Sequence, residues 1–288
     1  MANRNEMQVE KSTLKDFNQL IGRTQTQNYL QQVLGSKKSA FVNNITALVA
    51  NNKMLQECEP LTIMYAGIKA TALDLPLDSN LGFAYVIPYN NRKAGKVEAQ
   101  FQLGYKGFIQ LAIRSGQFRT LNVTDIREGE VHEVNILTGE IRFSAVENRI
   151  SKPVIGYAAY FELTNGFSKT LYMTKEEVEA HAKRYSQTYS SKYESTRESS
   201  KWSTDFDAMA KKTVLKLLLS KYAPLSVEMA EAQKADQAVV RESGYDYVDN
   251  DRDASEELEM QKAEAMEDAQ IVDMDGNDEE GINENPDF

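Results

Sequence analysis

Five lysines, one tryptophan and one tyrosine lie in a single stretch of the chain, KWSTDFDAMAKKTVLKLLLSKYAPLS (201–226). Lysine side chains hold phosphates as point charges, and aromatic rings stack on nucleobases. A single-stranded nucleic acid offers both phosphates and unpaired bases, so this composition is typical of a surface that binds one. The alternative is an ordinary helix whose lysines face solvent.

Two other segments, 90–96 and 105–119, combine basic residues with aromatic or amide side chains. No acidic residue occurs in 99–124, although the chain contains 43 aspartates and glutamates. The basic residues inside this gap are Lys106, Arg114 and Arg119. We therefore predict that anions approach the protein at these segments.

Catalytic chemistry has no clear candidate in this sequence. His132, His181 and the single cysteine, Cys58, are far apart and match no zinc site or nucleophilic triad. A phosphate loop of the G-x-x-x-x-G-K-[ST] type is excluded, because Asn90 stands where the first glycine is needed. No acidic residue before residue 245 has lysine two positions later, the pattern of common metal-dependent nucleases. We therefore expect a binding protein without a catalytic site.

The formal net charge of −10 conceals two different regions. Residues 245–288 contain 17 acidic and 2 basic residues, a net charge of −15, which leaves +5 on residues 1–244. The acidic segment has too few large apolar residues to fold alone, so we expect a disordered tail. It is either a solvating appendage, or a segment that docks a basic partner or competes with anionic ligands for the basic body.

Cysteine usage and hydropathy predict the compartment. One cysteine allows no intrachain disulfide, which suits a reducing cytosol. The first residues lack an apolar signal region, and no apolar run approaches the length of a membrane span. We expect a cytoplasmic protein with no membrane partner.

Hydrophobic periodicity predicts helices, then a region rich in strands, then further helices, which defines an α+β fold. We expect antiparallel hairpins packed with helices. The expected helices are 37–55, 59–75, 106–116, 175–187 after a Thr174 and Glu177 capping box, and a last one that is capped by Ser203 or Thr204 and ends before Pro224. The expected strands are a hairpin in 82–105, short strands in 119–126, 130–137 and 140–144, and a hairpin of 154–163 with 167–173.

These elements predict three regions. Residues 1–35 form a partly helical segment that contacts other subunits, 36–240 form the core, and 241–288 form the acidic tail. Within the core, residues 186–203 are polar and read as a mobile loop.

Three blocks resemble the RecT family of phage and prophage single-strand annealing proteins. They are ALDLPLDSNLGFAYVIPYNN (72–91), QFQLGYKGFIQLAIRSGQ (100–117) and WSTDFDAMAKKTVLKLLLSKYAPLS (202–226). Their order and spacing agree with the family over the region from Ala72 to Ser226. One departure is Asp74, where the family more often has glycine, and aspartate adopts left-handed backbone less readily.

The resemblance implies an ATP-independent protein that binds single-stranded DNA and anneals complementary strands during homologous recombination. It also implies assembly into rings or helical filaments on DNA, with the annealed duplex as an intermediate. The implied partners are a host single-strand-binding protein and a cognate 5′-to-3′ exonuclease. We expect no bound cofactor, and any Mg²⁺ dependence would belong to the annealing of DNA and not to a catalytic metal.

By the same resemblance, the matching basic residues are expected to hold phosphates in one continuous cationic trough. These residues are Lys106, Arg114, Lys211, Lys212 and Lys216. Tyr105 and Trp202 are expected to stack on bases or to line the trough. The remaining predicted DNA-binding residues are Arg92, Lys93 and Lys96 at the first hairpin tip, Arg119 and Lys201. The alternatives are a nuclease whose metal ligands come from distant segments, and a passive coating protein that does not pair strands.

Overall fold

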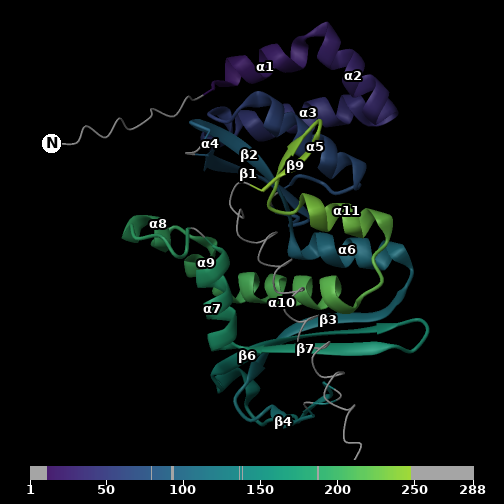
Figure 1. Cartoon of the computed structure of the whole chain (residues 1–288), viewed down its shortest axis with the longest axis vertical. Coiled ribbons are helices and arrows are strands. Elements are labelled where there is room, and N and C mark those ends of the chain that lie inside the picture. Colours follow the sequence, from purple (N-terminus) through teal and green to yellow (C-terminus); the bar gives the residue numbers. More distant parts are fainter. Residues whose placement is uncertain are drawn as a thin grey trace, which may run out of the picture. The chain divides into compact units, whose positions relative to one another are not determined.

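The computed structural model describes residues 12–78, 80–91, 94–135, 137, 139–186 and 188–247 (Figure 1). The predictions for residues 1–11, for Arg92 and Lys93, and for residues 248–288 therefore lie outside the described residues. Helices and antiparallel strands alternate along the described chain, which confirms the α+β class. No helix in the described ranges is both long and apolar enough to cross a membrane.

The first part of the described chain is helical. Its elements are α1 (Leu14–Gly22), α2 (Thr24–Leu34), the short 3-10 helix η1 (Gly35–Lys37), α3 (Lys38–Ala50), α4 (Lys53–Gln56) and α5 (Pro60–Ala72). Thr13 and Asp16 form a capping box on α1. The single helix predicted over 37–55 is divided, because the Asn52 side chain accepts the Met54 and Leu55 backbone N–H groups at 3.0 and 3.2 Å and so begins α4.

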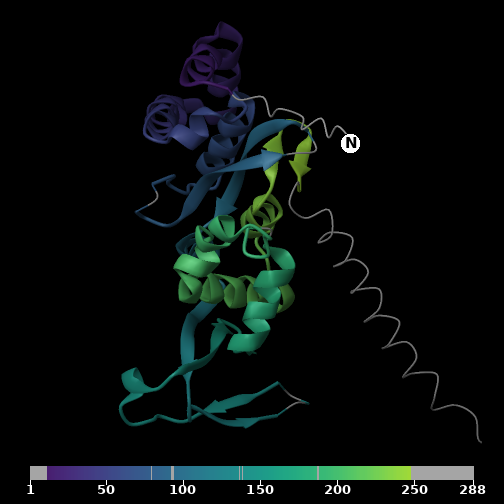
Figure 2. The ribbon, with the colours of Figure 1, turned by 90° about the vertical axis from the view of Figure 1, so that its left-hand side faces the viewer.

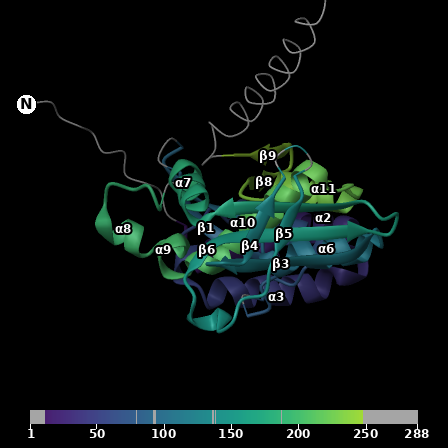
Figure 3. The same ribbon diagram turned by 90° about the horizontal axis from the view of Figure 1, so that it is seen from below.

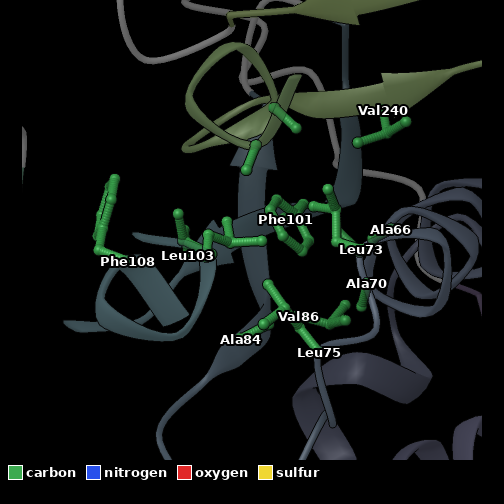
Figure 4. Packing of buried hydrophobic residues seen from close by; sticks show 14 of the residues in the cluster. Ala66, Ala70, Leu73, Leu75, Ala84, Val86, Phe101, Leu103, Phe108 and Val240 are labelled. Carbon is green, nitrogen blue, oxygen red and sulfur yellow. The ribbon is translucent and has the colours of Figure 1, made fainter. Parts of the chain in front are cut away.

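A two-stranded hairpin follows, as predicted, and packs on these helices. Strands β1 (Ala84–Asn91) and β2 (Lys96–Leu103) pair antiparallel along their whole length. The Thr62 hydroxyl of α5 accepts the Ala99 N–H of β2 at 2.9 Å, which fixes the helix on the hairpin. Figure 4 shows Phe101 of β2 surrounded by apolar side chains from both hairpin strands and α5.

A second, three-stranded antiparallel sheet forms the other end of the described unit. Its order is β3 (Phe118–Arg127), β6 (Val154–Leu163) and β7 (Ser168–Thr174). A separate ribbon of β4 (Val131–Val134) and β5 (Ile141–Phe143), followed by η2 (Arg149–Ser151), lies on one side of this sheet, and α10 (Phe206–Tyr222) lies on the other (Figures 1 and 3). The predicted hairpin through Asn165 and Gly166 is confirmed.

Helices α6 (Tyr105–Ser115), α10 and α11 (Val227–Ala235) lie between the hairpin and the sheet (Figures 1 and 2). Phe108, Leu111 and Ala112 of α6 are buried, as their spacing predicts. The buried residues of α10 include Leu215 and Leu219, so neighbouring elements cover more than one face of this helix. The lysines of α10 therefore lie beside groups from those elements.

The polar segment predicted as a mobile loop contains packed structure. After α7 (Lys175–Tyr185), which begins at the predicted capping box, it includes α8 (Glu194–Glu198) and α9 (Lys201–Thr204). Ser200 caps α9 and Asp205 caps α10, so the predicted caps at Ser203 and Thr204 are wrong. The prediction rested on the polar composition of this segment. It was wrong because aromatic rings, and not aliphatic residues, hold the short helices in place.

The chain continues past α11 into a small hairpin of β8 (Val239–Arg241) and β9 (Gly244–Asp246). The Tyr245 hydroxyl donates to Glu231 at 2.7 Å, and Phe101 of β2 pairs with Ala238. The boundary predicted at residue 241 therefore falls inside a hairpin that belongs to the core.

Candidate nucleic-acid interface

Lys212 and Lys216 converge on a buried carboxylate that the sequence prediction missed. The Lys212 and Lys216 Nζ atoms lie 3.8 and 2.9 Å from the carboxylate oxygens of Asp236, which follows α11. Asp236 also accepts the Leu103 N–H at 2.8 Å, and its side chain is fully buried. We call these three side chains, Asp236, Lys212 and Lys216, the Asp236 centre.

In the Asp236 centre one buried carboxylate is paired with two ammonium groups. Burial opposes ionisation of Asp236, but Lys212 and Lys216 outweigh it and hold its pKa below the usual value. Burial lowers the pKa of Lys212, and Asp236 opposes that shift. The Lys212 side chain is only 13% exposed, whereas that of Lys216 is 33% exposed. Lys212 therefore holds the helices together, and Lys216 is the one that reaches solvent.

A second carboxylate, Asp125 of β3, gathers three more cations. Its carboxylate lies 2.9 Å from Arg127 Nε, 3.4 Å from Arg149 Nη2 and 3.7 Å from Lys211 Nζ. Burial favours the neutral acid, but the Arg127 hydrogen bond and the neighbouring charges hold the pKa of Asp125 below its usual value. Lys211 of α10 thus faces the sheet, away from the α11 side where Lys212 and Lys216 lie.

Lys106 lies at the start of α6, where two of the sequence blocks pack against each other. A Cβ atom at Gly104 would lie 2.0 Å from the Gly82 carbonyl oxygen, and one at Gly107 would lie 2.1 Å from that of Phe83. Only glycine allows this close approach of helix and loop. Lys106 is exposed, and within the described residues it has no recorded ion pair, which makes it well suited to bind a phosphate.

Tyr105, beside Lys106, is partly buried against the apolar core. Burial raises the pKa of its hydroxyl. Its ring is therefore better placed to form a wall than to stack freely on a base.

Arg114 ties α6 to the end of α5. Its guanidinium donates to the Leu73 and Asp74 carbonyl oxygens at 2.9 and 3.1 Å. Asp74 has a φ of +52°, so this position is left-handed even though the residue is not glycine. Its side chain forms an ion pair with Lys37, which anchors the unfavourable conformation. The departure from the family pattern therefore leaves the turn intact.

The other predicted cations near the strands also have acidic neighbours. Lys96 Nζ lies 3.5 Å from Glu59, and Arg119 Nη1 lies 2.8 Å from Glu162 across the β3 and β6 pair. Arg119 is nonetheless largely exposed, and exposed ion pairs are weak. These contacts can exchange for phosphate at little cost.

Trp202 is not exposed, although the sequence suggested a stacking platform. Its side chain is 6% exposed, with ring centroids of Tyr189 and Phe206 at 6.2 and 5.5 Å. In this conformation the ring is part of the core, and it anchors α8 and α9. Lys201, next to it, is exposed.

The structure distributes the predicted cations over several elements. Glu59, the partner of Lys96, immediately precedes the start of α5, whereas Arg114 binds its end. A helix of this length extends about 20 Å, so these two cations are far apart. Among the predicted residues that the structure describes, Lys212 and Lys216 share one carboxylate. DNA contact by each of these residues stays a prediction.

Sequence reasoning missed Asp236, Asp125 and Arg149. Each lies outside the basic segments, and no motif marks it. The only available signal was that a lysine pair on a well-covered helix requires a buried counter-charge. Within the described residues, no group of three or more His, Cys, Asp or Glu side chains is arranged to hold a metal.

Comparison with known proteins assigns this architecture to a class. The RecT family model matches residues 39–255, most of the chain, so the protein belongs to the RecT family, as the sequence blocks predicted. The chain is 46% identical over 202 residues to the uncharacterized protein YqaK of Bacillus subtilis (strain 168), which covers 70% of this chain and 65% of YqaK. It is 30% identical over 185 residues to Protein RecT of Escherichia coli (strain K12), which covers 64% of this chain and 65% of that protein. Each match thus spans just under two thirds of the relative's length.

Proposed function

We propose that this protein binds single-stranded DNA and anneals complementary strands in homologous recombination, without ATP and without a catalytic site. The observation that carries the proposal is the RecT family match over residues 39–255. It is supported by packing between the first two sequence blocks, because Gly104 and Gly107 seat one block on the other and Arg114 binds Leu73 and Asp74.

Annealing needs no reactive side chain. Two strands repel each other through their phosphates, so a protein that neutralises one backbone and leaves the base edges accessible removes part of the barrier. Base pairing between the strands then supplies the specificity. The residues that hold the backbone can therefore be sequence-independent cations.

The described structure divides the candidate residues by accessibility. Lys106 and Lys201 are exposed, and Lys216 and Lys211 are each about one third exposed while paired with a carboxylate. We propose that Lys106, Lys201 and Lys216 contact phosphates first, and that Lys212 positions Lys216. We also propose that neighbouring subunits extend this path for DNA in a ring or helical filament.

The proposed biological setting is a phage or prophage recombination system. An exonuclease that acts from 5′ to 3′ would supply the single strand, and a host single-strand-binding protein would deliver it.

The direct test is a fluorescence-quench annealing assay with two complementary oligonucleotides, one carrying a fluorophore and the other a quencher. We expect the protein to accelerate quenching in the absence of ATP, while a non-complementary strand shows no quenching. Binding without faster annealing would indicate a passive coating protein and would contradict the proposal.

The same labelled strands, incubated with Mg²⁺ or Mn²⁺ and resolved on a denaturing gel, test the nuclease alternative. We expect strand length to stay unchanged. Shortened products that disappear with a chelator would overturn the non-catalytic part of the proposal. Electron microscopy of the protein with and without DNA tests the proposed ring or filament.

A further inference from the structure

The C-terminal end of α10 borders an open cavity of about 590 Å³. It is formed by the start of β3, the turn between β6 and β7, and the residues that end α10 (Figure 1). The side chains used below are Gln117, Asn165, Phe167, Lys221 and Tyr222. We call this space the α10-end cavity.

Two aromatic rings of the cavity are open to solvent. Phe167 is 48% exposed and Tyr222 is 41% exposed, so both rings are accessible where they line the cavity. Phe167 is held from behind, because its ring centroid lies 5.9 Å from that of Phe161, which in turn contacts Phe118 edge-on at 5.7 Å. The ring is thus supported on one side and available on the other.

The charges around the cavity favour an anionic ligand. Lys221 lines it, and Lys169 Nζ lies 5.1 Å from the Tyr222 ring centroid. No carboxylate is among the described residues that line it. The last carbonyl groups of α10 carry partial negative charge, and Lys221 in the last turn offsets it.

Gln117 and Asn165 add side-chain amides to the same wall. Amides can pair with the polar edge of a base without selecting one sequence. A second cavity, on the other side of the sheet, is lined by an acidic as well as a basic side chain, because Glu130 and Arg149 form an ion pair there.

We propose that the α10-end cavity is a nucleobase subsite for single-stranded DNA, in which a base stacks on Phe167 and Tyr222 while Lys221 holds the adjoining phosphate. This rests on the proposed function and adds a second kind of contact to the phosphate-binding cations. Rings, ammonium groups and amides together match a nucleotide. A basic peptide would be repelled by Lys221, and an aliphatic one would supply no anion for it.

The test compares two strands of equal length and charge, an oligothymidylate and an abasic strand, by fluorescence anisotropy. The wild-type protein is expected to prefer the oligothymidylate. The Phe167→Leu, Tyr222→Leu double variant is expected to lose about five- to 150-fold of that preference, because stacking of one base contributes about 1–3 kcal/mol. Its affinity for the abasic strand and its salt dependence are expected to stay as in the wild type.

Two further variants make the test specific. Tyr222→Phe, combined with native Phe167, keeps both rings and is expected to restore the preference. Tyr193→Leu is the matched control, because Tyr193 is 55% exposed and has Lys192 over its ring at 5.5 Å but lies outside the cavity. Circular dichroism and thermal unfolding establish that each variant is folded.

Three outcomes would overturn the subsite. The double variant could keep the full preference, it could lose affinity equally for both strands, or it could lose only self-association while DNA binding persists. The last result would identify a protein contact. A wild-type protein that binds neither strand would instead contradict the proposed function, so the two failures are distinguishable.

Discussion

The Asp236 centre and the α10-end cavity lie at different places along α10, and the lysines at these two places have different neighbours. In the Asp236 centre, two lysines share one fully buried carboxylate. In the α10-end cavity, Lys221 lies beside two half-exposed rings, and no acidic side chain is among its described lining residues. The difference shows that lysines on one helix can be structural at one point and available to a ligand at another.

The largest effect is expected from breaking the buried pair. Lys212→Ala removes one partner and leaves Asp236 with less compensation, which should lower the free energy of unfolding by about 3–5 kcal/mol. Urea unfolding measures this change. Lys234→Ala on α11 is the control, because its ion pair with Glu231 is exposed and should contribute about 0–1 kcal/mol. Equal effects of the two substitutions would mean that the Asp236 centre is not structural.

The next effect concerns pH, through the partly enclosed His181 of α7. Burial, then Lys216 and Arg184, lower the pKa of His181 to about 4 from 6.5. Between these two pH values, His181 is therefore mostly neutral in the folded protein and mostly protonated in the unfolded chain. Stability from this group is complete above pH 6.5 and is lost as the pH falls through about 4, a change of about 3 kcal/mol between pH 7 and pH 4.

His181→Gln is therefore expected to unfold with a shallower dependence of stability on pH in this window. Other groups, including Asp236, titrate alike in both proteins, so the difference isolates His181. His132→Gln alters an exposed residue of β4 and should keep the wild-type profile. Identical profiles for His181→Gln and the wild type would contradict the assignment.

A smaller effect is expected from substituting Lys106, which represents the exposed lysines in this comparison. Lys106→Ala should reduce the slope of log affinity against log salt by about 0.7 on single-stranded DNA, the value for one lost phosphate contact. Stability should hardly change, because the side chain is exposed. Lys53→Ala, on the exposed face of α4, should leave the slope as it is. An unaltered slope for Lys106→Ala would remove it from the interface.

Arg119 is expected to contribute little to stability. Its ion pair with Glu162 is solvent-exposed, so Arg119→Ala should lower the free energy of unfolding by about 1 kcal/mol or less. Measured beside Lys212→Ala, it gives the contrast between an exposed and a buried pair. A loss as large as that of Lys212→Ala would mean that accessibility does not separate the two classes.

The sequence predicted local structure correctly where the contacts that form it join residues close together in the chain. The capping box at Thr174, the helix start at Pro60 and the turn at Asn165 and Gly166 all depend on residues a few positions apart. Periodicity likewise predicted the buried face of α6. The prediction failed over 186–203, because α8 and α9 depend on Tyr189, Trp202 and Phe206 meeting in space.

The sequence by itself determined the α+β class, the hairpins, the family and the excess of cations in three segments. Only the tertiary structure decided which cations remain available. Lys212 and Lys216 show a helical spacing that reads as a solvent-exposed face, but Asp236 and the Leu103 N–H, distant in sequence, cover it. Periodicity states which residues share a face, and it carries no information about what packs on that face. A charge becomes structural or functional through its neighbours in space, and those neighbours exist only after folding.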